Sequence, residues 1–245
     1  MDFNKKVMEA NFPLLDKFRE LAPGSYKHCQ NVSNICENIA AELELDIDLL
    51  KCSALYHDVG KLNNPAYFSE NQTNGTNMHD SLDPFISCQI LTRHVGDSVL
   101  YLLQEPEIPK EIIPIISQHH GDTILQSIYQ KSKGEPEDKY RYKCKKPETT
   151  ETAILMIVDS VEATARALFN SKNESKKFIT KAINDTIDRL IDDGQLDTMK
   201  IGVLKIVKKV LFKELESIYH KRLVYTEEEK TIAEIKKDIV STKIE

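Results

Sequence analysis

The chain has 245 residues, of which 40% are hydrophobic and 29% are charged, and its formal net charge is −6. This composition predicts a soluble globular protein with one large domain or two small ones. The longest wholly apolar run, Ala153 to Val158, is too short to span a membrane, and no apolar signal region follows the first residues. The acidic balance disfavours a broad basic surface for a nucleic acid polymer. We therefore expect a cytoplasmic protein.

Five cysteines occur without CxxC spacing, and an odd number in a chain of this kind predicts reduced thiols rather than disulfides. Cys36, Cys52 and Cys88 lie in segments with helical apolar periodicity, which predicts small core residues. Cys29 follows His28, but adjacent residues of a helix point in different directions, so we do not count it among metal ligands.

Apolar residues recur at helical spacing along most of the chain, and no segment has the pattern of a strong strand. The first predicted helix runs from Ser25 to about Glu44 and carries His28 in its first turn. The second begins after Asp46, a favourable N-cap residue. Gly60 is placed to end it, so the pair His57-Asp58 is expected on its last turn.

Residues 62–79 are rich in Asn, Gly, Ser and Gln and predict a loop. A helix from about Ser81 is expected to end at His94, and another to run from about Asp97 to Gln104. Pro109 is placed to open a further helix that leads to the pair His119-His120.

The second half of the chain begins with a weak helical pattern and then a charged, irregular stretch up to residue 150. A helix over 149–169 is strongly apolar at its centre, around Asp159, which predicts a place in the middle of a bundle. Two longer helices are predicted near 175–192 and 198–222. We therefore expect an all-α fold, with one domain over 1–225.

The last segment, 226–245, opens with a capping-box pattern at Thr226 and continues with one thin apolar stripe. This predicts a C-terminal helical tail. We expect the tail to pack on the body of the protein or on a second copy of the chain in a homodimer.

Five of the seven histidines form an ordered set with two aspartates. A lone histidine is more often a hydrogen-bonded core or surface group than a ligand. Here four of them fall at the ends of four predicted helices, and one aspartate lies in an apolar stretch where an unpaired carboxylate is costly. Seven imidazole and carboxylate groups suit two transition-metal ions that share a bridging carboxylate, an arrangement that cleaves phosphate esters. The set is His28, His57, Asp58, His94, His119, His120 and Asp159.

Seven short segments contain these groups or lie between them: GSYKH (24–28), YHDVGK (56–61), ENQTNG (70–75), NMHD (77–80), HV (94–95), QHHG (118–121) and VDSVEA (158–163). In order and context they resemble the HD superfamily of metal-dependent phosphohydrolases. Within it they resemble the cytoplasmic HD domain of seven-transmembrane-helix cyclic di-AMP phosphodiesterases, from about Pro13 to about Leu223. The resemblance implies an HD-type helical bundle with the metal site at its centre, and a cytoplasmic domain whose relatives are membrane-tethered.

The resemblance also implies two metal ions, commonly iron or manganese. One would be held by His28, His57, Asp58 and Asp159, and the other by His94, His119, His120 and the shared Asp58. A hydroxide that bridges the ions would attack one phosphodiester of cyclic di-AMP, and the sugar 3′ oxygen would leave. The product would be linear 5′-phosphoadenylyl-adenosine (pApA).

Four further residues are candidate substrate contacts. Lys61 follows the His-Asp pair and is expected to contact a phosphate or assist the leaving oxygen. His79, in the predicted loop, is a candidate proton donor or supporting group. Arg141 and Tyr142 match an Arg-Tyr pair of the family, where tyrosine would stack on a base and arginine would meet a phosphate. After Tyr142 the chain departs from the usual family sequence, which weakens the case for base recognition but not for metal binding.

Other activities are left open by the sequence. An HD-GYP phosphodiesterase for cyclic di-GMP is disfavoured, because Gly121 follows the paired histidines and the chain contains no Gly-Tyr-Pro. A nucleotide monophosphatase or triphosphohydrolase is a second alternative, although many such HD proteins use fewer ligands. A di-iron oxygenase could use the same ligands and would consume oxygen. A catalytically silent nucleotide sensor is disfavoured by the intact ligand set.

Overall fold

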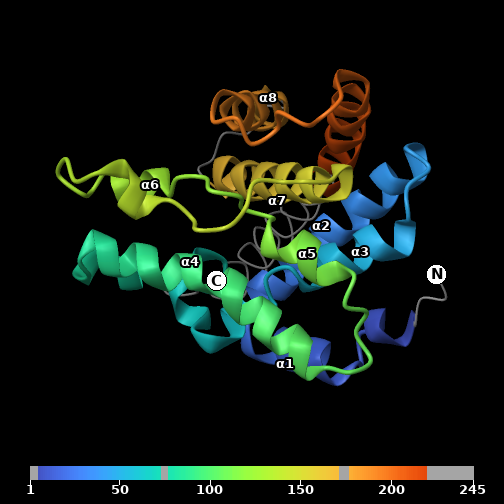
Figure 1. Cartoon of the computed structure of the whole chain (residues 1–245), viewed down its shortest axis with the longest axis horizontal. Helices are drawn as coiled ribbons and strands as arrows, with labels where there is room; N and C mark the ends of the chain where they lie inside the picture. Colours follow the sequence, from blue (N-terminus) through green and yellow to red (C-terminus); the bar gives the residue numbers. More distant parts are fainter. Residues whose placement is uncertain (1–4, 73–76, 171–176, 220–245) are drawn as a thin grey trace, which may run out of the picture.

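The computed structural model describes residues 5–72, 77–170 and 177–219. Over these residues the secondary structure is helical, apart from an isolated β-bridge between Ile124 and Arg141, which confirms the all-α prediction (Figure 1). None of the described helices has the length and apolar character needed to cross a membrane. The α-helices are α1 (Pro13–Leu21), α2 (Pro23–Glu42), α3 (Ile47–Tyr56), α4 (Pro84–Gln104), α5 (Ile112–Ser117), α6 (Gln126–Tyr129), α7 (Thr150–Asn170), α8 (Lys177–Asp192) and a last helix over 201–219.

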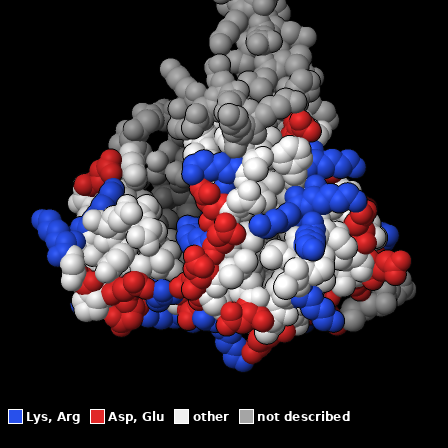
Figure 2. Space-filling view, turned by 90° about the horizontal axis from the view of Figure 1, so that it is seen from above, with Lys and Arg blue, Asp and Glu red and all other residues white. Residues whose placement is uncertain are grey.

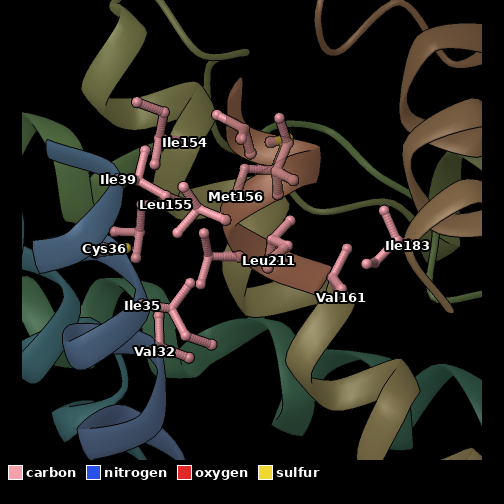
Figure 3. Packing of buried hydrophobic residues seen from close by; sticks show 14 of the residues in the cluster. Val32, Ile35, Cys36, Ile39, Ile154, Leu155, Met156, Val161, Ile183 and Leu211 are labelled. Atoms are coloured by element: carbon pink, nitrogen blue, oxygen red, sulfur yellow. The ribbon is translucent and has the colours of Figure 1, made fainter. Parts of the chain in front are cut away.

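Helix α7 lies in the middle of the fold, between α2 and α8 (Figure 1). Its unbroken apolar run is buried because neighbours cover it on several sides, as predicted for the centre of a bundle. Figure 3 shows Leu155 of α7 among Ile35 and Ile39 of α2, with Ile183 of α8 and Leu211 of the last helix in the same cluster. Each such side chain stabilises the fold by about 1.5–3 kcal/mol relative to an exposed one.

A second apolar cluster joins α1, α3, α5 and the end of α4. The sequence prediction missed α1, although Pro13 at its first position is a start signal and Leu14, Leu15 and Phe18 form its buried face. Cys36, Cys52 and Cys88 are buried and free, which confirms their prediction as core residues. The two clusters together hold the elements that carry the predicted ligands.

Helix α4 is one continuous element, so the prediction of two helices with a break after His94 is wrong. The helix continues through Gly96, at an entropic cost of about 1 kcal/mol relative to alanine. As a result His94 lies in the middle of a long helix, and its position is fixed from both sides.

Gly60 does not end α3, which stops at Tyr56, so the pair His57-Asp58 follows the helix rather than forming its last turn. Gly60 instead lies in a short 3-10 helix, η2 (Val59–Asn63), packed against α4. A Cβ at Gly60 would lie 2.1 Å from the carbonyl oxygen of His94, so only glycine allows this close approach. Ser98 completes the contact, because its Oγ accepts from Gly60 N and donates to His57 O, both at 2.8 Å.

Other boundaries differ by a few residues. Helix α2 begins at Pro23, which places His28 in the second turn, and α5 begins at Ile112 rather than at Pro109. The predicted loop over 62–79 contains short 3-10 turns, η3 (Pro65–Tyr67) and η4 (Ser69–Asn71), and a third, η5 (Met78–Ser81), crosses its end. The predicted tail over 226–245, and with it the domain boundary at 225, lies outside the described residues. On the face that carries α8, acidic and basic side chains lie side by side (Figure 2).

Candidate metal centre

All seven predicted ligands converge at one place, although they come from five parts of the chain. They lie on α2, directly after α3, on α4, directly after α5, and on α7. The ligand atoms fall into two groups, in each of which every atom lies within 4.8 Å of the others. The first ligand group is His28, His57 and Asp159, and the second ligand group is Asp58, His94, His119 and His120.

Asp58 presents one carboxylate oxygen to each group. Its Oδ2 lies 3.4 Å from His57 Nε2 and 3.8 Å from His28 Nε2, whereas its Oδ1 lies 3.2 Å from His94 Nε2. A carboxylate placed in this way can hold one cation with each oxygen. The geometry therefore suits the shared ligand expected from the sequence.

Asp159 joins the two groups from the opposite wall. Its Oδ1 lies 2.9 Å from His28 Nε2 and 3.6 Å from His57 Nε2, and its Oδ2 lies 3.6 Å from His120 Nδ1. The side chain is only 8% exposed. Burial raises the pKa of Asp159, but the hydrogen bond from His28 and the nearby rings of His57 and His120 outweigh it and lower the pKa well below its usual value. The carboxylate is therefore ionised and available to a cation.

Backbone hydrogen bonds fix the orientation of three ligand rings. His57, His94 and His119 each donate Nδ1–H to the carbonyl oxygen three residues earlier, at 2.7, 2.6 and 2.6 Å. A carbonyl can only accept, so each Nδ1 carries a proton and each Nε2 is the nitrogen that faces the site. This is the arrangement that a metal-binding imidazole requires.

Unsatisfied atoms point to a cation between these groups. Among the described residues, His57 Nε2 and Asp58 Oδ1 are buried without a hydrogen-bond partner. The Nε2 atoms of His94 and His119 face each other at 3.4 Å, where neither has a proton to offer if both Nδ1 atoms are protonated. Buried acceptors without donors are costly, and bound cations would satisfy them. The residues present therefore fit a metal site.

Two of the histidines are held neutral. Burial, together with the nearby rings of His57 and His94, lowers the pKa of His119 to about 3. Burial and the adjacent His119 lower the pKa of His120 well below its usual value. Neutral rings do not have to lose a proton before they bind a metal ion. His119 and His120 are therefore ready to bind metal at neutral pH.

His28 differs in its protonation, because both of its ring nitrogens contact carboxylates. Burial alone would lower its pKa, but Glu162 and Asp159 outweigh burial and raise the pKa to about 10. Without metal the ring is thus protonated on both nitrogens, and a metal ion would replace the proton on Nε2. Glu162 was not singled out in the sequence analysis, although it follows Asp159 by one helical turn in the segment VDSVEA.

Lys61 is buried beside the shared carboxylate. Its Nζ lies 2.6 Å from Asp58 Oδ2 and 2.7 Å from Glu70 Oε1. Glu70 is anchored in turn by Ser25, whose Oγ donates to the same oxygen at 2.8 Å. A Cβ at Gly24 would lie 1.9 Å from the carbonyl oxygen of Glu70, so the turn packs directly on the start of α2. The sequence analysis gave Glu70 no role, although it opens the segment ENQTNG.

Tyr142 lies where a substrate contact was expected, but Arg141 faces elsewhere. The Tyr142 ring packs on His120 with centroids 4.3 Å apart. The Arg141 guanidinium donates to Asp193 at 2.8 Å, to Glu137 at 2.6 Å and to the backbone near the β-bridge. It does not line the cavity beside the ligands. Its predicted phosphate contact is untested.

Cys29 lies beside His57, His79 contacts Tyr67, and neither lines the cavity. His79 donates its Nε2–H to the carbonyl oxygen of Tyr67 at 2.9 Å. Its role as a proton donor stays a prediction. The sulfur of Cys29 lies 3.6 Å from His57 Nδ1, and could form a third group with His57 and Asp58. Because that nitrogen is on the opposite edge of the ring from Nε2, the sulfur contacts the ring outside the two ligand groups.

An open cavity of about 980 Å³ leads to the ligands. Its volume lies at the upper end of the range for small-molecule sites. Cationic, aromatic and metal-ligating side chains meet in its wall, which suits an anionic ligand with planar rings. The residues that carry this character are His28, Lys61, His94, His120, Tyr142 and Asp159.

Comparison with known proteins assigns the fold. Residues 25–164 match the HD domain family. The chain is 38% identical over 229 residues to cyclic-di-AMP phosphodiesterase PgpH of Listeria monocytogenes, covering 91% of this chain and 31% of that protein. It is 35% identical over 233 residues to cyclic-di-AMP phosphodiesterase PgpH of Bacillus subtilis, covering 93% and 32%. The chain thus spans about a third of the length of these relatives.

A solved structure agrees over most of the chain. The crystal structure of the L. monocytogenes PgpH HD domain in complex with cyclic-di-AMP superposes with a TM-score of 0.79 at 37% sequence identity. The match covers 86% of this chain and all of that domain. With the convergent histidines and aspartates described above, these comparisons establish the family: the chain belongs to the HD domain family.

Proposed function

We propose that this domain is a metal-dependent phosphodiesterase that hydrolyses cyclic di-AMP to pApA. The observation that carries the proposal is the Asp58 carboxylate, which presents one oxygen to each of two ligand groups at the end of a large cavity. The adenine specificity is supported by the relatives, two of which are named as cyclic-di-AMP phosphodiesterases and one of which was crystallised with that nucleotide.

The cofactor would be a pair of divalent transition-metal ions, iron or manganese. Imidazole nitrogen and carboxylate oxygen together suit such ions. When bound, the two ions would lower the pKa of a water molecule and offset the charge that builds up on the phosphate. We assign the first ion to His28, His57, Asp58 and Asp159, and the second to His94, His119, His120 and Asp58.

Lys61 would bind the phosphate that is cleaved. Burial lowers the pKa of Lys61, but Asp58 and Glu70 outweigh burial and raise the pKa above its usual value. The side chain therefore stays protonated and can donate a hydrogen bond to a phosphate oxygen or to the leaving 3′ oxygen. It lies at the cavity wall, close to where a phosphate must come to meet both ligand groups.

The remaining candidates would act on the rest of the substrate. Tyr142 lines the cavity and offers its ring, already packed on His120, as a surface for a base. His79 would act as a supporting group or proton donor, and Arg141 would meet a phosphate, as the family resemblance implies. For Arg141 this requires the guanidinium to leave its contacts with Asp193 and Glu137.

Product chromatography tests the proposal. The purified chain, stripped of metal and reloaded with Mn²⁺ or with Fe²⁺ under anaerobic conditions, is incubated separately with cyclic di-AMP and cyclic di-GMP. We expect conversion of cyclic di-AMP to pApA and little turnover of cyclic di-GMP. Preferential turnover of cyclic di-GMP would overturn the base assignment. No turnover of either by protein shown to hold two metal ions would overturn the proposal, and oxygen consumption would then point to the oxidative alternative.

A further inference from the structure

Glu162 is a buried carboxylate that belongs to neither ligand group, yet it contacts a ligand directly. It follows Asp159 by one turn of α7, and its side chain is only 1% exposed. Its Oε2 accepts from His28 Nδ1 at 2.6 Å, and its Oε1 accepts from Asn31 Nδ2 at 2.9 Å. Both oxygens of the carboxylate are therefore committed to partners on α2, which holds the His28 ring in one orientation.

This contact distinguishes His28 from three other ligands. His57, His94 and His119 each donate Nδ1–H to a neutral backbone carbonyl. His28 donates to a carboxylate instead, and a hydrogen bond to a charged acceptor is stronger than one to a neutral carbonyl. A carboxylate at Nδ1 increases the electron density at Nε2, and so strengthens the bond that Nε2 makes to a metal ion.

Negative charge is also distributed unequally between the groups. The first ligand group contains Asp159 and is backed by Glu162, whereas the second ligand group has Asp58 as its single anion beside three imidazoles. The Arg166 guanidinium, 3.4 Å from Glu162, offsets part of this difference. Its side chain is 21% exposed and makes the longer contact, so the buried 2.6 Å hydrogen bond to His28 has the greater effect on the ring.

We propose that Glu162 is a positioning residue that makes the first ligand group the tighter of the two metal positions. The two ions then bind in sequence, and the first enters at His28, His57 and Asp159. Glu162 acts through His28 and does not itself bind metal. The inference rests on the two-metal phosphodiesterase proposed above, but it concerns the order and strength of metal binding, which can be measured without substrate.

Calorimetric titration of the metal-free full chain with Mn²⁺ tests this order. The wild-type protein should bind two ions in two resolved steps. Glu162→Gln keeps the shape of the side chain and an oxygen that can accept from His28, but removes the charge. It should raise the Kd of the tighter step by about 10–100-fold and leave the weaker step within about twofold. The increase in Tm on adding one equivalent of Mn²⁺ should fall in parallel.

Two further variants control for folding. Glu42→Gln removes an exposed carboxylate at the end of α2, paired with Lys209 outside the site, and should leave both steps unchanged. If Glu162→Gln does not fold, Asn31→Ala serves in its place, because it frees one Glu162 oxygen while leaving the ligands intact. It should weaken the same step by a smaller factor.

Three outcomes would overturn the inference: two equal steps in the wild-type protein, unchanged affinities in Glu162→Gln, or equal loss at both steps. Hydrolysis of cyclic di-AMP by the wild-type protein with both ions bound is measured separately. Activity together with any of these outcomes would contradict the role of Glu162 and leave the proposed function standing. Failure to bind two ions at all would contradict both.

Discussion

Lys61 and Asp58 form a buried ion pair at the centre of the site, with Nζ 2.6 Å from Oδ2. The same oxygen lies 3.4 Å from His57 Nε2, so the ammonium group and the first ligand group meet at one carboxylate atom. Glu70 holds the ammonium from its other side at 2.7 Å. The pair couples the shared ligand to the phosphate-binding candidate, and variants of the two residues should have separable effects.

Replacement of the shared ligand should remove metal and activity together. In Asp58→Ala neither ligand group keeps its bridging oxygen, so we expect loss of bound metal and a fall in kcat/KM of more than about 100-fold. The far-ultraviolet circular dichroism should remain that of a helical protein. Metal content by mass spectrometry and rates with cyclic di-AMP check this. Full activity in this variant would refute the assignment.

Replacement of the lysine should spare the metals and slow turnover. Lys61→Met keeps the apolar stem but removes the charge, and we expect two bound ions with a kcat lowered by about 10²–10³-fold. Lys51→Met, which removes a lysine paired with Glu37 away from the site, is the matched control and should retain its rate. Loss of both metals in Lys61→Met would show that the lysine supports the ligands rather than the substrate.

The role of Arg141 can be decided by measuring the effects of its replacement on substrate binding and on protein stability separately. If its guanidinium acts as it lies, bridging Glu137 and Asp193, Arg141→Ala should lower Tm by several degrees with KM unchanged. If it meets a phosphate, as the family resemblance predicts, KM should rise at least tenfold with little change in Tm. The proposed phosphate contact predicts the rise in KM, and a fall in Tm with KM unchanged would contradict it.

Acid should lower the stability of the metal-free protein, in part because it protonates the Glu70 carboxylate. Burial raises the pKa of Glu70, but the neighbouring Lys61 outweighs burial and lowers the pKa to about 2, from an ordinary value of 4.5. A carboxyl whose pKa is lowered by folding stabilises the fold above its unfolded pKa and loses that effect as the pH falls toward its folded pKa. Its contribution, on the order of 3 kcal/mol, should therefore disappear between pH 4.5 and 2.

Urea denaturation of metal-free wild-type and Glu70→Gln proteins measures this contribution. The variant should have the lower free energy of unfolding at pH 7. The difference between the two proteins should shrink as the pH is lowered from 4.5 to 3. A difference that stays constant over this range would show that the Glu70 charge does not stabilise the fold.

Sequence patterns predicted the helical fold and singled out the seven side chains that the structure brings together, because both leave local or compositional signals. The apolar run around Asp159 predicts a central helix, and a buried carboxylate there requires a partner. The residues at which helices begin and end were less predictable. Gly96 resembles a break in the pattern, but α4 continues through it with buried residues on both sides. Gly60 resembles a helix end, whereas its role depends on the close approach of His94 from a distant part of the chain.

Supporting residues were missed for a similar reason. Glu162 acts on His28, which is 134 residues away, and Glu70 contacts Ser25, which is 45 residues away. Within their own helix or turn both resemble ordinary acidic residues. Arg141 shows the converse. Its basic, aromatic surroundings suggest nucleotide binding, but the structure supplies acidic partners at Glu137 and Asp193. Such assignments depend on tertiary contacts that a periodic pattern does not contain.

Anomalous X-ray diffraction from crystals of the Mn²⁺-loaded chain locates each metal ion independently of activity, and so tests the two-metal site itself. We predict two anomalous peaks on either side of Asp58, one at His28, His57 and Asp159 and the other at His94, His119 and His120. Two peaks about 3.5–4 Å apart would fit a pair that acts on one phosphate. A single peak, or two peaks that do not share Asp58, would contradict the two-metal site.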